Sequence, residues 1–194
     1  MTKNRVLLID VTTRKSAIVH NLTDTGYEVV GCHNDLNNLH AKVLLAQPDV
    51  LIICINQSCE NLVTELKQVN DEDALPIIVF TDNTDFDWME EVFESGVISF
   101  IYKGLEPIRI PSIIEAAKLR HSQLAVLKSE LNEAKHKLQS RVVIDKAKGM
   151  LMEYQKMSEK QAYRALQKTA MDQATTILDI AQQTIRALNK KFDY

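Results

Sequence analysis

Two groups of residues in this sequence have the types and the spacing that chemistry requires. Members of the first group stand at the ends of short apolar runs: Asp10, Val11, Cys54, Thr81 and Lys103. Members of the second group are cations, with one glycine among them, in the C-terminal part of the chain: Arg141, Lys146, Lys148, Gly149, Arg164 and Lys168. A carboxylate, a thiol, a hydroxyl and an ammonium group could together transfer a chemical group or hold a metal ion, whereas clustered cations suit a polyanion.

The first group is positioned by apolar runs that predict buried strands. The five runs, at 5–10, 29–31, 49–55, 76–81 and 97–102, are continuous rather than alternating, which is typical of strands covered on both faces of a parallel sheet. Helix-length stretches separate them at 14–25, 35–46, 58–69, 86–95 and from 107 onward, and Gly26 and Gly96 stand where helices should end. Five such units predict a flavodoxin-like α/β fold, in which chemistry takes place at the carboxyl ends of the strands.

Residues 3–120 resemble a response-regulator receiver domain in these strand ends and their spacing. Such receivers carry two acids after the first strand, a phospho-accepting aspartate after the third, a serine or threonine after the fourth and a lysine after the fifth. Asp10, Thr81 and Lys103 match this pattern, but Val11 replaces the second acid and Cys54 replaces the acceptor. Because phosphorylation needs a carboxylate nucleophile and oxygen ligands for Mg²⁺, we expect a pseudo-receiver that is not phosphorylated.

The sequence leaves two alternatives for what remains of that pocket. Cys54 could be a redox sensor or a nucleophile, but a cysteine after an apolar strand is more often a small buried apolar residue. Lys103 and Asp10 could pair with each other as a structural remnant. The three cysteines form no CxxC motif, and no segment has the character of a membrane span or a signal peptide. We therefore expect a reduced, cytoplasmic protein with neither a disulfide framework nor a metal site.

The middle of the chain, residues 111–140, predicts a long helix with an apolar seam. After Pro111 there is no further proline up to Tyr154, and good helix formers dominate. Apolar residues recur there at spacings of three and four: Leu124, Leu127, Leu131, Ala134 and Leu138. A helix that extends past a globular domain cannot bury such a seam on that domain alone, so the pattern predicts a coiled-coil homodimer. The alternative is a seam that folds back onto the first domain.

The C-terminal part, residues 141–194, predicts a basic bundle of three helices. The net formal charge is −9 over residues 1–110, +2 over 111–140 and +4 over 141–194. Ser158 and Gln161 form a capping-box pattern that opens a second helix. Gly149 lies inside a predicted helix, where it costs about 1 kcal/mol relative to alanine, which indicates close approach by a neighbouring helix or by a ligand. The bundle should expose one cationic surface.

A second resemblance lies in this part of the chain. Ala147 to Met152, Ser158 to Tyr163, and the later Leu166, Ala170–Met171 and Ile180–Ala181 resemble the ANTAR domain over residues 137–190. A pseudo-receiver, a coiled coil and an ANTAR domain in this order resemble antitermination regulators of the AmiR and NasT type. The resemblance implies RNA binding: such domains hold stem-loops in a leader transcript, so that the terminator hairpin does not form.

The resemblance also implies candidate contacts and a regulator. The six residues of the second group become candidate RNA contacts, with the cations on phosphates and loops. Tyr163 could stack on a base, although a core position is the favoured interpretation. Control would come from a ligand-sensing partner of periplasmic-binding-protein fold, and not from phosphorylation.

Other classes of function fit the sequence less well. A DNA-binding regulator of the response-regulator type needs a basic recognition helix. The stretch from Thr175 to Leu188 has little positive charge before its very end, and its outward residues are Asp179, Gln182, Gln183 and Arg186. An adaptor that binds an acidic protein through the basic bundle is a third possibility. The sequence has no glycine-rich phosphate loop, no clustered metal ligands and no nucleophile–base pair, so we expect no enzymatic activity and no cofactor.

Overall fold

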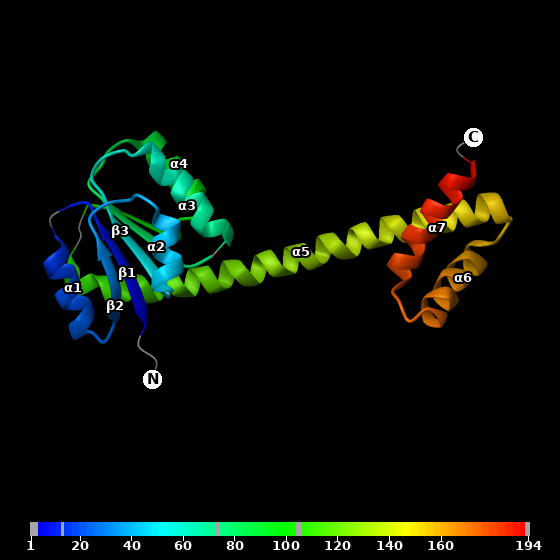
Figure 1. The fold of residues 1–194 in the computed structure, drawn as a ribbon, viewed down its shortest axis with the longest axis horizontal. Coiled ribbons are helices and arrows are strands. Elements are labelled where there is room, and N and C mark those ends of the chain that lie inside the picture. The colour runs from blue at the N-terminus through cyan, green and yellow to red at the C-terminus, as the bar shows by residue number, and fades with distance from the viewer. Residues whose placement is uncertain (1–3, 13, 73, 104–105, 193–194) are drawn as a thin grey trace. The chain divides into compact units, whose positions relative to one another are not determined.

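A computed structural model describes every residue of the protein except 1–3, 13, 73, 104–105 and 193–194. The chain forms two compact units, Met1–Ala125 and Val126–Tyr194. One helix, α5 (Ile110–Gln155), runs through the division between them (Figure 1). The predicted boundaries at 110 and 140 stay a prediction, because α5 begins at the first of these positions and continues through the second.

The first unit is a five-stranded parallel sheet covered on both faces. The strands are β1 (Arg5–Asp10), β2 (Glu28–His33), β3 (Val50–Cys54), β4 (Ile77–Thr81) and β5 (Ser99–Tyr102), in the order β2-β1-β3-β4-β5. The helices are α1 (Lys15–Asp24), α2 (Leu39–Ala46), α3 (Glu60–Glu72), α4 (Phe86–Glu94) and the 3₁₀ turn η1 (Pro107–Arg109). One apolar cluster joins the sheet to α2, α3 and α4, and the other joins it to α1 and the start of α5. The predicted flavodoxin-like fold is confirmed.

Two glycines end helices as the sequence predicts. Gly26 follows α1 with a φ of 89°, and Gly96 follows α4 with a φ of 105°. Both lie in the left-handed region, where a side chain is disfavoured. These glycines let the chain turn from a helix back into the next strand.

The base of α5 is anchored to the first unit by apolar packing and by one buried phenol. Ile110, Ile114 and Ala117 are buried in the second apolar cluster. The hydroxyl of Tyr27 donates a hydrogen bond to Glu115 Oε1 at 2.9 Å. Burial of the phenol, together with this hydrogen bond to a carboxylate, raises the pKa of Tyr27 to about 12. The start of α5 is therefore a structural part of the receiver-like unit.

Replacing Tyr27 by phenylalanine should lower the free energy of unfolding by about 1 kcal/mol, because it leaves Glu115 without its donor. Folding raises the pKa of Tyr27 from 10.0 to about 12. The hydroxyl therefore contributes its full share to the free energy of unfolding below pH 10, and this share is lost as the pH rises through about 12. Urea unfolding of both proteins over this range measures the difference. A difference that stays constant up to the alkaline end would contradict the assignment.

The second unit is a three-helix bundle, as predicted. It consists of the end of α5, α6 (Glu159–Asp172) and α7 (Ile177–Phe192). Small and medium apolar residues fill its core: Ala147, Leu151, Ala162, Leu166, Ala170, Ile180 and Ala181. The capping box is confirmed. Ser158 Oγ accepts a hydrogen bond from the backbone N–H of Gln161, and Gln161 Oε1 accepts one from the backbone N–H of Ser158 at 2.8 Å. This cap fixes where α6 begins.

Candidate nucleic-acid interface

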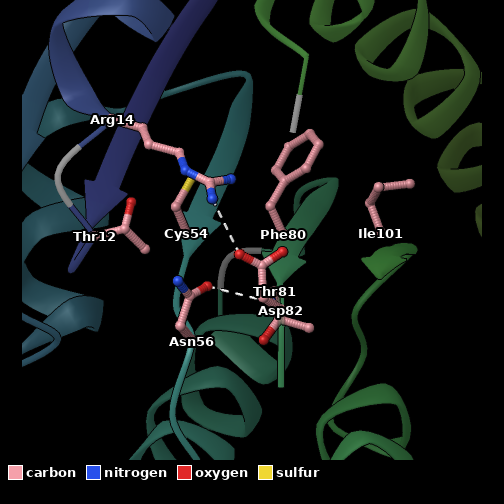
Figure 2. Close-up of a pocket in the computed structure, with 8 residues that line it drawn as sticks. All are labelled: Thr12, Arg14, Cys54, Asn56, Phe80, Thr81, Asp82 and Ile101. Atoms are coloured by element: carbon pink, nitrogen blue, oxygen red, sulfur yellow. Dashed lines mark hydrogen bonds and ion pairs between the residues drawn. The ribbon is translucent and has the colours of Figure 1, made fainter. Parts of the chain in front are cut away.

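The carboxyl ends of the strands form a small closed pocket in the first unit. Figure 2 shows eight residues around it: Thr12, Arg14, Cys54, Asn56, Phe80, Thr81, Asp82 and Ile101. The cavity among them has a volume of about 10 Å³, which is room for about one water molecule. Arg14 Nη2 donates to Asp82 Oδ2 at 3.1 Å, and Asn56 Oδ1 accepts from the Asp82 amide at 3.2 Å. The pocket is thus closed by its own side chains.

Of the receiver-type residues, Cys54 and Thr81 line this pocket, whereas Asp10 and Lys103 are not among the lining residues. Asp10 is buried and accepts hydrogen bonds through Oδ1 from the amide and hydroxyl of Thr12. Lys103 has a φ of 46° and is exposed, and its Nζ lies 5.2 Å from the centre of the Tyr102 ring. The alternative in which Lys103 pairs with Asp10 is therefore wrong: the Lys103 side chain lies over the Tyr102 ring instead.

The donors in this pocket do not suit a magnesium ion. Asp10 is the one carboxylate of the receiver pattern that remains, beside the thiol of Cys54 and the half-exposed Val11. Magnesium prefers several oxygen ligands, and a thiol is a poor replacement. Within the described part of the chain, no group of three or more His, Cys, Asp or Glu residues is placed to hold a metal ion.

Cys54 lies in the environment of an apolar core residue. Its side chain is 1% exposed, and the register of the sheet sets it beside Asp10. Burial and the negative charge of Asp10 both raise the pKa of the thiol far above its usual range. The neutral thiol is a weak nucleophile, so this geometry favours the packing role over the redox role.

We expect Cys54 to be the slowest of the three cysteines to react with iodoacetamide. Cys59 is partly exposed, whereas Cys54 is buried and stays protonated at about pH 8. Mass spectrometry of the modified peptides measures the order, and unfolding in urea should remove the difference. Native Cys54 reacting as fast as Cys59 would contradict the packing role.

The cations of the second group fall into two kinds. Arg141, Lys146, Arg164 and Lys168 are exposed. Lys148 has a side chain that is only 15% exposed, and its Nζ lies 2.8 Å from both Asp145 Oδ1 and Glu159 Oε1. The hydrogen bond to Asp145 and, to a smaller extent, the one to Glu159 raise the pKa of Lys148. Lys148 therefore links α5 to the start of α6, and two carboxylates neutralise its charge.

Gly149 does not serve the packing of a neighbouring helix, so that interpretation is wrong. A Cβ built at Gly149 would meet no atom within 4 Å, because α6 and α7 contact α5 through Ala147 and Leu151 instead. The residue is exposed in the middle of a continuous helix. Approach of a ligand to this open stretch of backbone is the interpretation that remains.

Substituting Gly149 by alanine should therefore raise the free energy of unfolding by about 1 kcal/mol, because the helix gains rigidity and no clash arises. If RNA approaches the backbone there, the same substitution should weaken RNA binding about tenfold. Thermal unfolding and RNA titration of the one variant separate the two effects. A lower free energy of unfolding would show that a side chain at position 149 clashes with its surroundings.

The most exposed cationic surface of the bundle is a row on α6. Lys160, Arg164 and Lys168 stand four residues apart, all exposed and all opposite the buried positions of the helix. Within the described residues, none of the three has a carboxylate partner. Like charges at this spacing destabilise an isolated helix by a few tenths of a kcal/mol per pair. An unneutralised row of this kind suits a polyanion.

A second row on α6 runs beside the cations. It carries Tyr163, Gln167 and Met171, of which Tyr163 is 43% and Met171 75% exposed. The favoured core position for Tyr163 is wrong, because Ala162, Leu166 and Ala170 occupy the buried face. Sequence reasoning did not include Lys160 and Met171 among the candidates, although extending the four-residue spacing in both directions along α6 would have found them.

Comparisons with known proteins find similarity in both units of the chain. The family model of the ANTAR domain matches residues 132–185. The transcriptional regulatory protein PdtaR of Mycobacterium tuberculosis is 25% identical over 172 residues, which is 89% of this chain and 84% of that protein. The nitrate regulatory protein of Klebsiella oxytoca is 43% identical over 68 residues, which is 34% of this chain but only 17% of that protein.

Solved structures support the fold of the first unit. A CheY-like response-regulator receiver domain from Methanospirillum hungatei superposes with a TM-score of 0.54 at 17% identity, over 63% of this chain and 98% of that one. The likeness is one of fold alone. Along the described residues, no helix is both long enough and apolar enough to cross a bilayer.

Proposed function

We propose that this chain, which joins a receiver-fold domain to an ANTAR domain, is an RNA-binding transcription antiterminator. Its C-terminal unit would bind stem-loops in the leader of a nascent transcript and hold the form that excludes the terminator hairpin. The observation that carries the proposal is the α6 row of Lys160, Arg164 and Lys168, which faces solvent and has no neutralising carboxylate in the part of the chain that the structure describes.

The two rows of α6 suit single-stranded loops better than duplex. Cations neutralise phosphates and make affinity depend on salt, while exposed aromatic side chains stack on unpaired bases. Tyr163 and Met171 lie beside the cations and offer such surfaces. Arg141, Lys146 and the open backbone at Gly149 add contacts on the same unit, whereas Lys148 would first have to leave its two carboxylates.

Dimerisation is the second part of the proposal. The seam residues Leu124, Leu127, Leu131 and Leu138 are 46–65% exposed in the single chain. A parallel coiled coil through this seam would bury them and present two RNA-binding units at once. Two loops bound by one dimer gain affinity through effective concentration, without any new contact.

The receiver-fold unit would supply regulation without phosphate. Its pocket lacks the carboxylates that phosphorylation requires, and Arg14 and Asp82 close it. A ligand-sensing partner of periplasmic-binding-protein fold is the proposed input, as the resemblance to antitermination regulators of the AmiR and NasT type implies.

A DNA-binding transcription factor is the alternative, and the exposed residues of the last helix support it less well than α6 supports RNA binding. Among the α7 residues whose side chains the structure describes, the exposed ones include Asp179, Gln182 and Gln183, and Arg186 is the one cation. A recognition helix in the major groove usually carries more positive charge.

The test is a gel shift with the full chain and the 5′ leader of the operon beside its gene. Expected is binding of the two-loop leader, much weaker binding when the loops are scrambled, and no shift of the same sequence as duplex DNA. A transcription assay on that template should show more read-through when the protein is present. Equal affinity for scrambled RNA, or preference for the duplex DNA, would refute the proposal.

A further inference from the structure

The outer face of α4 carries two exposed phenylalanines. Trp88 and Val92 are buried on the inner face, where α4 packs beside α3 in the first unit (Figure 1). Phe86 and Phe93 are 75% and 56% exposed on the opposite side. They are seven residues apart, which is two helical turns and about 10 Å along the axis. Exposed aromatic side chains at this spacing are typical of an interface.

The same face is strongly acidic. Between Lys67 and Lys103 the sequence has nine Asp and Glu residues and no Lys or Arg. Four of these acids lie on α4 and are exposed: Asp87, Glu90, Glu91 and Glu94. Two pairs of them stand four residues apart, where like charges repel. Within the described residues, none of the four takes part in an ion pair.

From this face we infer a docking site for a cationic amphipathic helix of a partner protein. Cations on the partner would neutralise the α4 carboxylates, and two apolar side chains spaced about 10 Å apart would cover Phe86 and Phe93. A nucleic acid would be repelled, and a second copy of this face would bring like charges together. The negative charge of α4 therefore favours a partner helix with basic residues, and Phe86 and Phe93 favour apolar residues on that same helix.

This inference rests on the proposed function in one respect: the partner that docks on α4 would be the proposed regulatory partner. The α4 face contains none of the candidate RNA contacts, which all lie beyond residue 140. A variant of α4 can therefore lose partner binding and still bind RNA.

The experiment uses the full chain and two labelled synthetic helices of about five turns. Both carry the same lysines; one has leucines seven residues apart, and in the other these are glutamines. Fluorescence anisotropy at about 0.15 M salt should show binding of the leucine helix about tenfold tighter than that of the glutamine helix. The pair F86A/F93A should remove this preference, and E90Q/E94Q should weaken both helices.

The matched control is L44A/L45A on α2, which removes two leucines that are 50% and 88% exposed. This variant should bind as the unaltered chain does, and F86A/F93A should still shift the leader RNA. Equal binding of the two helices, or an equal loss in L44A/L45A, would overturn the inference. Self-association of the chain that disappears in F86A/F93A would also overturn it, since the occupant would then be a second copy.

Discussion

Replacing Lys160, Arg164 and Lys168 together by alanine should lower the affinity for leader RNA by roughly a hundredfold at physiological salt. Each cation that contacts a phosphate of a single strand releases a counterion and contributes about 0.7 to the slope of log K against log salt. Loss of all three should therefore reduce that slope by about 2. Titrations at several salt concentrations, on the full chain, measure both quantities.

The fold of this variant should be unaffected. The three side chains lie opposite the core of the bundle and have no carboxylate partner among the described residues, so their removal relieves repulsion without exposing apolar surface. A matched control removes three exposed cations of the first unit, Lys15, Lys67 and Arg109, and should leave the salt slope unchanged. If both triple variants lose affinity equally, binding depends on overall charge and not on α6.

Replacing Leu127 by glutamate should convert the proposed dimer into a monomer at micromolar concentration. Position 127 lies in the predicted seam, where a coiled coil would bury the introduced charge next to its copy from the partner. The monomer should bind a single stem-loop as the dimer does, but its affinity for the two-loop leader should fall by a factor of about 100. Sedimentation and RNA titration of the same sample measure both effects.

The adjacent Val126 provides the control. Its side chain is 57% exposed against 58% for Leu127, yet it points away from the seam by the helical period. Val126→Glu should therefore remain dimeric and keep its affinity for the two-loop leader. If both variants stay dimeric, the seam is not the interface. If both become monomeric, the interface extends beyond the seam to the side of α5 that carries Val126.

A monomeric Leu127→Glu variant that keeps full affinity for the two-loop leader would separate the two parts of the proposal. Dimerisation through α5 would stand, but the gain from binding two loops at once would not. The α6 variant would then carry the whole test of RNA binding.

Residue types and local patterns were sufficient to predict the helices and strands and the loss of receiver chemistry. Continuous apolar runs marked all five strands. In β1, β3 and β4, which are buried on both faces, there is no room for alternation. Gly26, Gly96 and the Ser158–Gln161 box marked helix ends, because these depend on backbone conformation and hydrogen bonds within a few residues. The absence of a carboxylate at position 54 is a matter of residue type alone.

Which candidate side chains are exposed and unpaired depends on how the helices pack against one another. Lys148 was predicted to contact RNA, but Glu159, eleven residues away on the next helix, reaches it at 2.8 Å. Gly149 faces open space because Ala147 and Leu151 make the contacts between helices, and Tyr163 is exposed because the core of α6 lies one position away. Helical periodicity gives each residue an angle around its own axis. Which angle faces another element depends on how the helices pack, and that information is not local in the sequence.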